Sequence, residues 1–197
     1  MARYAIIGWG SLIWDLEVLA EQVRGGWAMG AGPRLPMEFT RVSPKRKRAL
    51  VVCLDAEHGV GCTTNAIRSG RARIEGVIED LARRERAPIA HIGALCLRSG
   101  HVQGGKPEVA DTVRRWCAAG GWAGAVWTDL PSNFVEELGA PFSVPRGLGY
   151  LRTLAGDSLD EAVRYIEQAP PATDTPLRRA LAADGWWSAE ARRLGLR

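Results

Sequence analysis

The chain has 197 residues, of which 46% are hydrophobic and 24% charged, the composition of an ordinary globular protein rather than a disordered or fibrous one. No apolar run approaches the roughly 18 residues of a membrane span and no signal segment opens the chain, so we expect no membrane association and a cytoplasmic location. The net charge of +4 is mildly basic, which favours acidic ligands or nonspecific nucleic-acid attraction without establishing either.

The first predicted element is a buried strand that breaks into a loop with two glycines. Ile6 and Ile7 form the continuous apolar run of a central strand, and Gly8 and Gly10 follow it. Glycines allow another group to approach the backbone closely, and such a loop can point several N–H groups at a carbonyl or carboxylate oxygen. A tight turn with Ser11 as a cap explains the same residues without a ligand.

Three better-defined motifs are absent from this stretch. A dinucleotide-binding G-x-G-x-x-G would need glycine where Ile13 stands. A nucleophile elbow, G-x-S-x-G, would need glycines in place of Trp9 and Ile13 around Ser11. The phosphate-binding G-x-x-x-x-G-K-[ST] pattern does not occur either.

The residues from Gly8 to Trp14, Gly-Trp-Gly-Ser-Leu-Ile-Trp, resemble the G-Y-G-S-L-[IM]-W strand and loop that opens the gamma-glutamylcyclotransferase-like family, which includes the ChaC branch. The resemblance implies that backbone N–H groups of the loop bind a gamma-glutamyl group and that a later glutamate is the acid/base. Trp9 stands where the family has tyrosine, so a phenolic hydroxyl is missing. We therefore expect the family's fold with an altered substrate.

A short helix is predicted over 16–23, followed by a hairpin whose strands are 35–43 and 49–54. The turn between these strands, 44–48, reads Pro-Lys-Arg-Lys-Arg and gives the hairpin a basic tip. Such a tip can contact nucleic acid, but a solvated loop is the simpler interpretation.

Metal-binding patterns are weak. His58 lies in a turn-like segment next to acidic residues rather than along one helix face, and His91 and His101 have no partner at a ligand spacing. The four cysteines, Cys53, Cys62, Cys96 and Cys117, lack C-x-x-C spacing and are interpreted as free core residues. We expect neither a metal nor another cofactor.

An amphipathic helix is predicted over 71–85. Its apolar residues fall at i, i+3, i+4 and i+7 from Ile74, and Glu85 returns to within roughly 20° of Ile74 on a helical wheel. Glu75, Glu79 and Asp80 fall on other faces and are expected to face solvent. Glu85 is thus directed inward, where lost hydration suits a carboxylate to proton transfer. An early helix end, or simple pairing with an arginine, is the competing interpretation.

The resemblance also covers the end of this helix. The segment 81–85, Leu-Ala-Arg-Arg-Glu, matches the family's L-x-x-R-E segment, whose terminal glutamate is catalytic. This match implies that Glu85 is the acid/base.

Strands over 92–97 and 123–127 and a helix over 108–118 come next. The polar string 128–134, Thr-Asp-Leu-Pro-Ser-Asn-Phe, then offers two interpretations. Ser132 or Asn133 can cap a helix through Glu136, or the polar groups can orient a ligand at the end of a strand. The string resembles one found in an uncharacterised bacterial branch of the same family.

From residue 145 onward the strand signals disappear. A helix is predicted over 158–168 with Ser158 and Glu161 as a capping box, and another over 175–183, before a basic tail that begins at Trp186. We expect domain 1–144 to carry the enzyme-like fold and 145–197 to be a helical extension packed on it or on a second subunit, which leaves a homodimer open.

The sequence therefore predicts an α+β fold, with a small mixed or antiparallel barrel-like sheet flanked by helices. The expected activity is cyclisation of a gamma-glutamyl amine or amide to 5-oxoproline, with Glu85 as the catalytic residue. The expected substrate-binding residues are Gly8, Trp9, Gly10, Ser11, Leu12, Trp14 and Asn133. A catalytically inactive ligand-binding protein and a basic nucleic-acid-binding module are the alternatives, and separated basic clusters make nucleic acid the weaker one.

Overall fold

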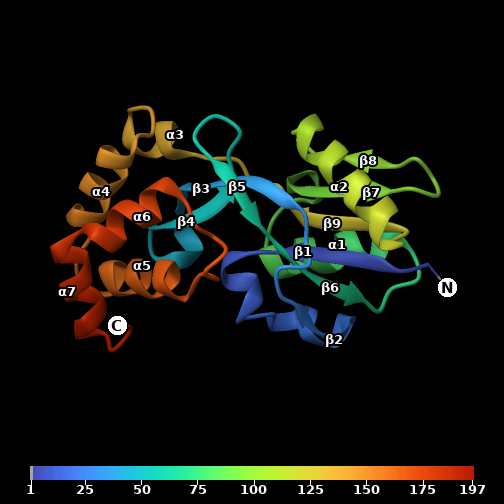
Figure 1. The fold of residues 1–197 in the computed structure, drawn as a ribbon, viewed down its shortest axis with the longest axis horizontal. Helices are drawn as coiled ribbons and strands as arrows, with labels where there is room; N and C mark the ends of the chain where they lie inside the picture. The colour runs from blue at the N-terminus through green and yellow to red at the C-terminus, as the bar shows by residue number, and fades with distance from the viewer. Residues whose placement is uncertain (1) are drawn as a thin grey trace. The chain divides into compact units, whose positions relative to one another are not determined.

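The computed structural model describes residues 2–197, and the chain divides into two compact units. Unit 1 combines the N-terminal chain up to Leu35 with Thr63–Leu130, and unit 2 combines Pro36–Cys62 with Pro131–Arg197. Each unit contains both strands and helices (Figure 1).

Unit 1 is organised around a six-stranded mixed sheet in the order β2-β6-β1-β9-β7-β8. The central strand β1 pairs antiparallel with β6 and parallel with β9. Every residue of β1 is buried, as its apolar run predicts. The strands are β1 (Tyr4–Gly8), β2 (Val23–Ala28), β6 (Asn65–Ser69), β7 (Ile92–Cys96), β8 (Val102–Gln103) and β9 (Gly124–Thr128).

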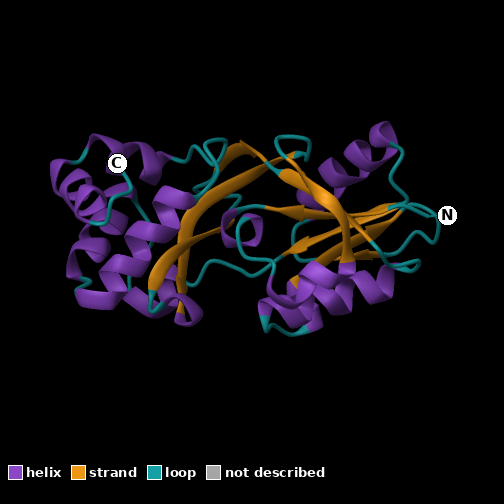
Figure 2. Ribbon diagram, turned by 90° about the horizontal axis from the view of Figure 1, so that it is seen from below, coloured by secondary structure: helices purple, strands orange, loops and turns teal. Residues whose placement is uncertain are grey.

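Two α-helices pack on this sheet, which has helices on both faces (Figure 2). Helix α1 (Ile74–Glu85) contacts β1, β7 and β9, and helix α2 (Pro107–Gly120) contacts β7 and β9. The predicted apolar stripe of α1 packs against Ile6 and Val126 in one buried cluster. The predicted helix over 16–23 is instead a 3₁₀ helix, Glu17–Gln22.

The second sheet has three strands in the order β4-β3-β5: β3 (Arg34–Ser43), β4 (Ala49–Leu54) and β5 (Val60–Thr63). The predicted hairpin is confirmed, because β3 and β4 pair antiparallel around a 3₁₀ turn at Pro44–Arg46. The β3–β4 register shifts between Glu38 and Arg41. A bulge of this kind breaks strict alternation, which is why Phe39 and Thr40 are both fully buried.

Five α-helices belong to unit 2: α3 (Phe134–Leu138), α4 (Val144–Thr153), α5 (Gly156–Gln168), α6 (Pro176–Ala183) and α7 (Gly185–Arg193). Helices α4 and α5 contact β4, and α6 and α7 contact α4 and α5 respectively. The predicted cap at Ser158 is wrong, because α5 already begins at Gly156. The predicted tail is largely helix α7, whose Trp187 is fully buried.

The α+β class is confirmed, and the sheets of the described residues form no closed barrel. The compact units differ from the expected division at residue 144, because the hairpin of β3 and β4 belongs with the C-terminal helices. Packing of α5 on β4, far apart in the sequence, is the physical reason. In residues 2–197 no helix is long and apolar enough to span a membrane.

Candidate functional site

The predicted binding loop follows β1 directly, and glycine is required at its two glycine positions for different structural reasons. A Cβ on Gly8 would lie 2.3 Å from a ring carbon of Trp27, so the glycine makes room for the indole. Gly10 has a φ of 53°, a left-handed conformation that strains other residues. Gly10 opens a short 3₁₀ helix, Gly10–Ile13, in which Gly10, Ser11 and Leu12 are buried.

Two residues that sequence analysis did not select hold the start of this loop. Asn65 is buried on β6, donates from Nδ2 to the Gly8 carbonyl at 3.3 Å and accepts at Oδ1 from Gly30 N at 2.9 Å. The buried indole Nε1 of Trp27 has no acceptor within the described part of the chain. Only the pairing of distant strands brings these residues to the loop, so no local pattern could have identified them.

Arg84 links the loop to the end of α1. Its side chain is only 2% exposed, and Nη2 donates to the Asp15 carbonyl at 2.5 Å and lies 3.5 Å from Ser11 Oγ. A buried guanidinium is stable only when acceptors surround it, and the turn after the glycines supplies them. The loop and the helix end therefore lie together on unit 1.

Glu85 is the last residue of α1, as the sequence predicts, and its side chain is 13% exposed. Its Oε1 accepts from Arg84 Nη1 at 3.0 Å. Glu85 is thus directed largely inward, and it is also paired with an arginine, so features of both interpretations of the sequence are present. The ion pair holds the Glu85 carboxylate next to Arg84, the residue that contacts the loop.

The expected solvent face of α1 needs one correction. Glu75 and Glu79 are exposed, but Asp80 is buried. Arg71 donates to Asp80 through Nε at 2.7 Å and Nη2 at 2.8 Å, a bidentate pair that compensates the buried charge. The helical wheel missed this residue because it takes no account of partners outside the helix.

The two tryptophans of the loop differ in accessibility. Trp9 is 7% exposed and belongs to the core, whereas Trp14 is 38% exposed. Of the two, Trp14 is the one that can meet a ligand without rearrangement of the protein. Trp9 thus occupies a buried position.

Asn133 belongs to unit 2 and has a structural partner there. Its Oδ1 accepts from Val42 N at 2.7 Å, and its Nδ2 donates to Val42 O at 3.0 Å. The neighbouring Ser132 donates to Thr40 O at 2.7 Å. The polar string thus holds the chain against β3. At the start of α3, Ser132 Oγ accepts from Phe134 N at 3.4 Å, whereas Asn133 makes no side-chain cap.

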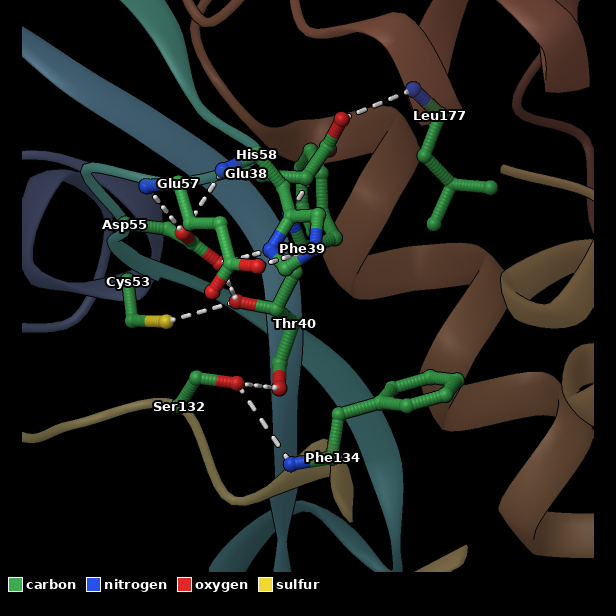
Figure 3. A network of polar contacts seen from close by, with 10 residues as sticks. All are labelled: Glu38, Phe39, Thr40, Cys53, Asp55, Glu57, His58, Ser132, Phe134 and Leu177. Carbon is green, nitrogen blue, oxygen red and sulfur yellow. Dashed lines mark hydrogen bonds and ion pairs between the residues drawn. The ribbon is translucent and has the colours of Figure 1, made fainter. Parts of the chain in front are cut away.

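A second polar cluster, centred on Asp55, lies in unit 2 (Figure 3). Asp55 accepts from Thr40 Oγ1 at 2.8 Å and from the backbone N–H groups of Glu57 and His58, and its Oδ2 lies 3.3 Å from His58 Nδ1. Burial acts to raise the pKa of Asp55, but these hydrogen bonds outweigh it and lower the pKa. Every oxygen is used inside the fold, so the cluster is explained by turn stability.

Glu38 is the most buried acid of that region. Its oxygens accept from Phe39 N at 2.8 Å and from Leu177 N, at the start of α6, at 3.1 Å. Burial raises the pKa of Glu38 although these donors act in the opposite direction. Glu38 thus fixes the start of α6 to β3.

The basic tip of the hairpin is paired within unit 2. Arg46 contacts Glu161 at 3.2 Å, Lys47 contacts Asp157 at 2.8 Å and Arg48 contacts Glu137 at 3.2 Å. These carboxylates compensate the positive charges that would otherwise be available to bind the phosphates of a nucleic acid.

In residues 2–197 no group of three or more His, Cys, Asp or Glu side chains is placed to hold a metal ion. The four cysteines are free and buried, as the sequence predicts.

No family model, curated protein or solved structure compared with the chain gives a match.

Proposed function

We propose that the protein is a gamma-glutamylcyclotransferase-like enzyme that converts a gamma-glutamyl amine or amide to 5-oxoproline and releases the amine. The observation that carries the proposal is the set of Arg84 contacts. One buried guanidinium bonds to Glu85, to the Asp15 carbonyl and to Ser11, and so joins the acid/base candidate to the candidate binding loop.

The chemistry needs few groups. The alpha-amine of the substrate attacks its own gamma-carbonyl, a nitrogen–carbon bond closes the ring, and the original amide bond breaks. Because the nucleophile is tethered, the protein has to hold the glutamyl chain in the cyclising conformation. Glu85 takes a proton from the alpha-ammonium group and returns it to the leaving nitrogen, help worth roughly 10²–10⁴ in rate.

The loop supplies the second contribution. The N–H groups of Gly10, Ser11 and Leu12 open a helical turn, where the first donors have no acceptor inside the turn itself. Aimed at the gamma-carbonyl oxygen, one such donor contributes about 3–4 kcal/mol to the stabilisation of the developing negative charge. The more exposed Trp14 is the candidate to cover the substrate from water.

The test is to incubate the protein with a panel of gamma-glutamyl amines and amides and to measure 5-oxoproline by mass spectrometry. At least one compound is expected to give 5-oxoproline with the unaltered protein. We expect Glu85→Gln to lower that rate by roughly 10²–10⁴, because the amide cannot accept the proton.

Glu79→Gln is the matched control, because Glu79 is an exposed glutamate on the same helix. It should retain full activity. Equal activity of the Glu85 and Glu79 variants would remove Glu85 from the mechanism. If none of the compounds yields 5-oxoproline, the proposed cyclising activity is contradicted.

A catalytically inactive ligand-binding protein is the alternative. It predicts that gamma-glutamyl compounds bind, as measured by calorimetry, without turnover. The nucleic-acid alternative is weaker, since the hairpin tip is paired to carboxylates of its own unit.

A further inference from the structure

A cavity of about 310 Å³ opens on unit 1 beside the first residues of β1 and α1. The candidate loop and Glu85 lie at the opposite ends of the same two elements. Twelve residues of helix separate the two ends of α1, roughly 18 Å at 1.5 Å per residue. The volume lies at the lower end of the range for small-molecule sites. The cavity is therefore distinct from the proposed catalytic site.

The lining of this cavity combines a thiol with hydrogen-bond donors. Cys96, at the end of β7, is only 3% exposed yet contributes to the wall, together with Tyr4 and Ser99. Tyr4 Oη lies 3.8 Å from Cys96 Sγ. After β7 the chain turns back, with Gly100 N donating to the Cys96 carbonyl at 3.0 Å, and so brings Arg98 and Ser99 to the sulfur.

These donors change the character of the thiol. Burial acts to raise the pKa of Cys96, but hydrogen bonds from the Ser99 hydroxyl, the N–H groups of Ser99 and Arg98, and Tyr4 outweigh it and lower the pKa. Cys117, in the same unit, has no such donors, and burial raises its pKa to about 12. A thiolate is the attacking species in exchange with disulfides, so the two cysteines should react very differently.

The mouth of the cavity is basic. The exposed side chains of Arg73 and Arg98 line it, and Glu75 compensates only one of them, through its 3.2 Å contact with Arg73. Guanidinium groups bind carboxylates bidentately and attract anions to a cleft. A ligand that reaches Cys96 past Arg98 is thus expected to be negatively charged.

We propose that this cavity is a thiol–disulfide exchange site at which Cys96 forms a mixed disulfide with a small anionic disulfide. The Cys96 thiolate attacks one sulfur of the ligand, a new bond forms between that sulfur and Cys96 Sγ, and the ligand's own disulfide bond breaks. The other half leaves as a thiolate, and the proton of Cys96 goes to solvent. A second thiol reverses the modification.

The experiment compares two disulfide probes on the full, reduced chain. The anionic probe is 5,5′-dithiobis(2-nitrobenzoate), the neutral one is 4,4′-dithiodipyridine, and mass-spectrometric peptide mapping assigns each modified cysteine. Cys96 is expected to react at least about tenfold faster than Cys117 with the anionic probe. Cys96→Ser should remove the fast phase, and because the mapping also works on the unaltered chain, the assignment survives if that variant folds poorly.

Arg98→Gln tests the basic mouth. We expect it to slow the anionic probe about threefold to tenfold, while the neutral probe stays within about twofold. Arg115→Gln, at an exposed arginine of α2 that does not line the cavity, is the matched control and should change neither rate. Reaction of Cys96 no faster than Cys117, or an Arg98 variant that leaves the preference for the anionic probe unchanged, would overturn the proposal.

Discussion

The two ends of β1 and α1 carry polar groups that the fold uses in opposite ways. At the loop end, the two terminal nitrogens of the buried Arg84 guanidinium bond within the chain and keep Glu85 and the turn after Gly10 together. At the other end, Cys96 faces a cavity of about 310 Å³ with exposed arginines at its mouth. The same strand and helix thus have one end that is tied internally and one end that is open.

The difference teaches how to separate stability from reactivity in this unit. A polar group with internal partners should affect unfolding when it is removed, because its partners stay buried without compensation. A polar group that lines a cavity should in addition affect chemistry at that cavity. Variants at the two ends can therefore be compared by the same pair of measurements.

Among these variants, the largest effect is expected from Arg84→Met, which replaces the guanidinium by an uncharged group and retains a long aliphatic side chain. It leaves the Asp15 carbonyl and Glu85 without their donor, so we expect the free energy of unfolding to fall by about 1–3 kcal/mol. Urea denaturation followed by tryptophan fluorescence measures the change.

Arg83→Met is the control for this variant. Arg83 is exposed, and its nearest carboxylate contact, to Asp80, is 3.9 Å long. A surface contact of this kind contributes about 0–1 kcal/mol. Equal losses in the two variants would show that Arg84 does not tie the loop to the helix.

A smaller loss is expected from Gly10→Ala. Gly10 has a φ of 53°, and the Cβ of alanine makes that conformation unfavourable by about 1–2 kcal/mol. Gly26→Ala is the control, because its added Cβ meets no atom within 4 Å and no left-handed φ is required there. The melting temperature should be lower for the Gly10 variant than for the Gly26 variant. Equal melting temperatures would contradict backbone strain at Gly10.

The smallest effect is expected from Tyr4→Phe at the open end. Loss of the hydroxyl removes one donor to Cys96, so the pKa of the thiol should rise and both disulfide probes should slow by about the same factor, roughly twofold to fourfold. Stopped-flow absorbance at neutral pH measures both rates. A change in the ratio of the two rates would mean that Tyr4 acts on the probe rather than on the sulfur.

Sequence patterns located those parts of the fold that depend on local periodicity. The strand at Ile6, the apolar stripe of α1 and the inward direction of Glu85 follow from which residues recur on one face. Patterns failed where a partner elsewhere in the chain decides the outcome, as at Asp80, which Arg71 holds in the interior. A bulge in β3, which buries both Phe39 and Thr40, likewise depends on pairing with β4.

By itself, the sequence determined an α+β chain with a glycine loop after its first strand and an acidic residue at the close of its amphipathic helix. The tertiary structure alone decided that Arg84 joins these two features, and that Tyr4, Arg98 and Ser99 surround the sulfur of Cys96. The physical reason is that periodicity reports only which face of an element is apolar. The partner of a buried polar group depends on which distant segments the sheet brings together.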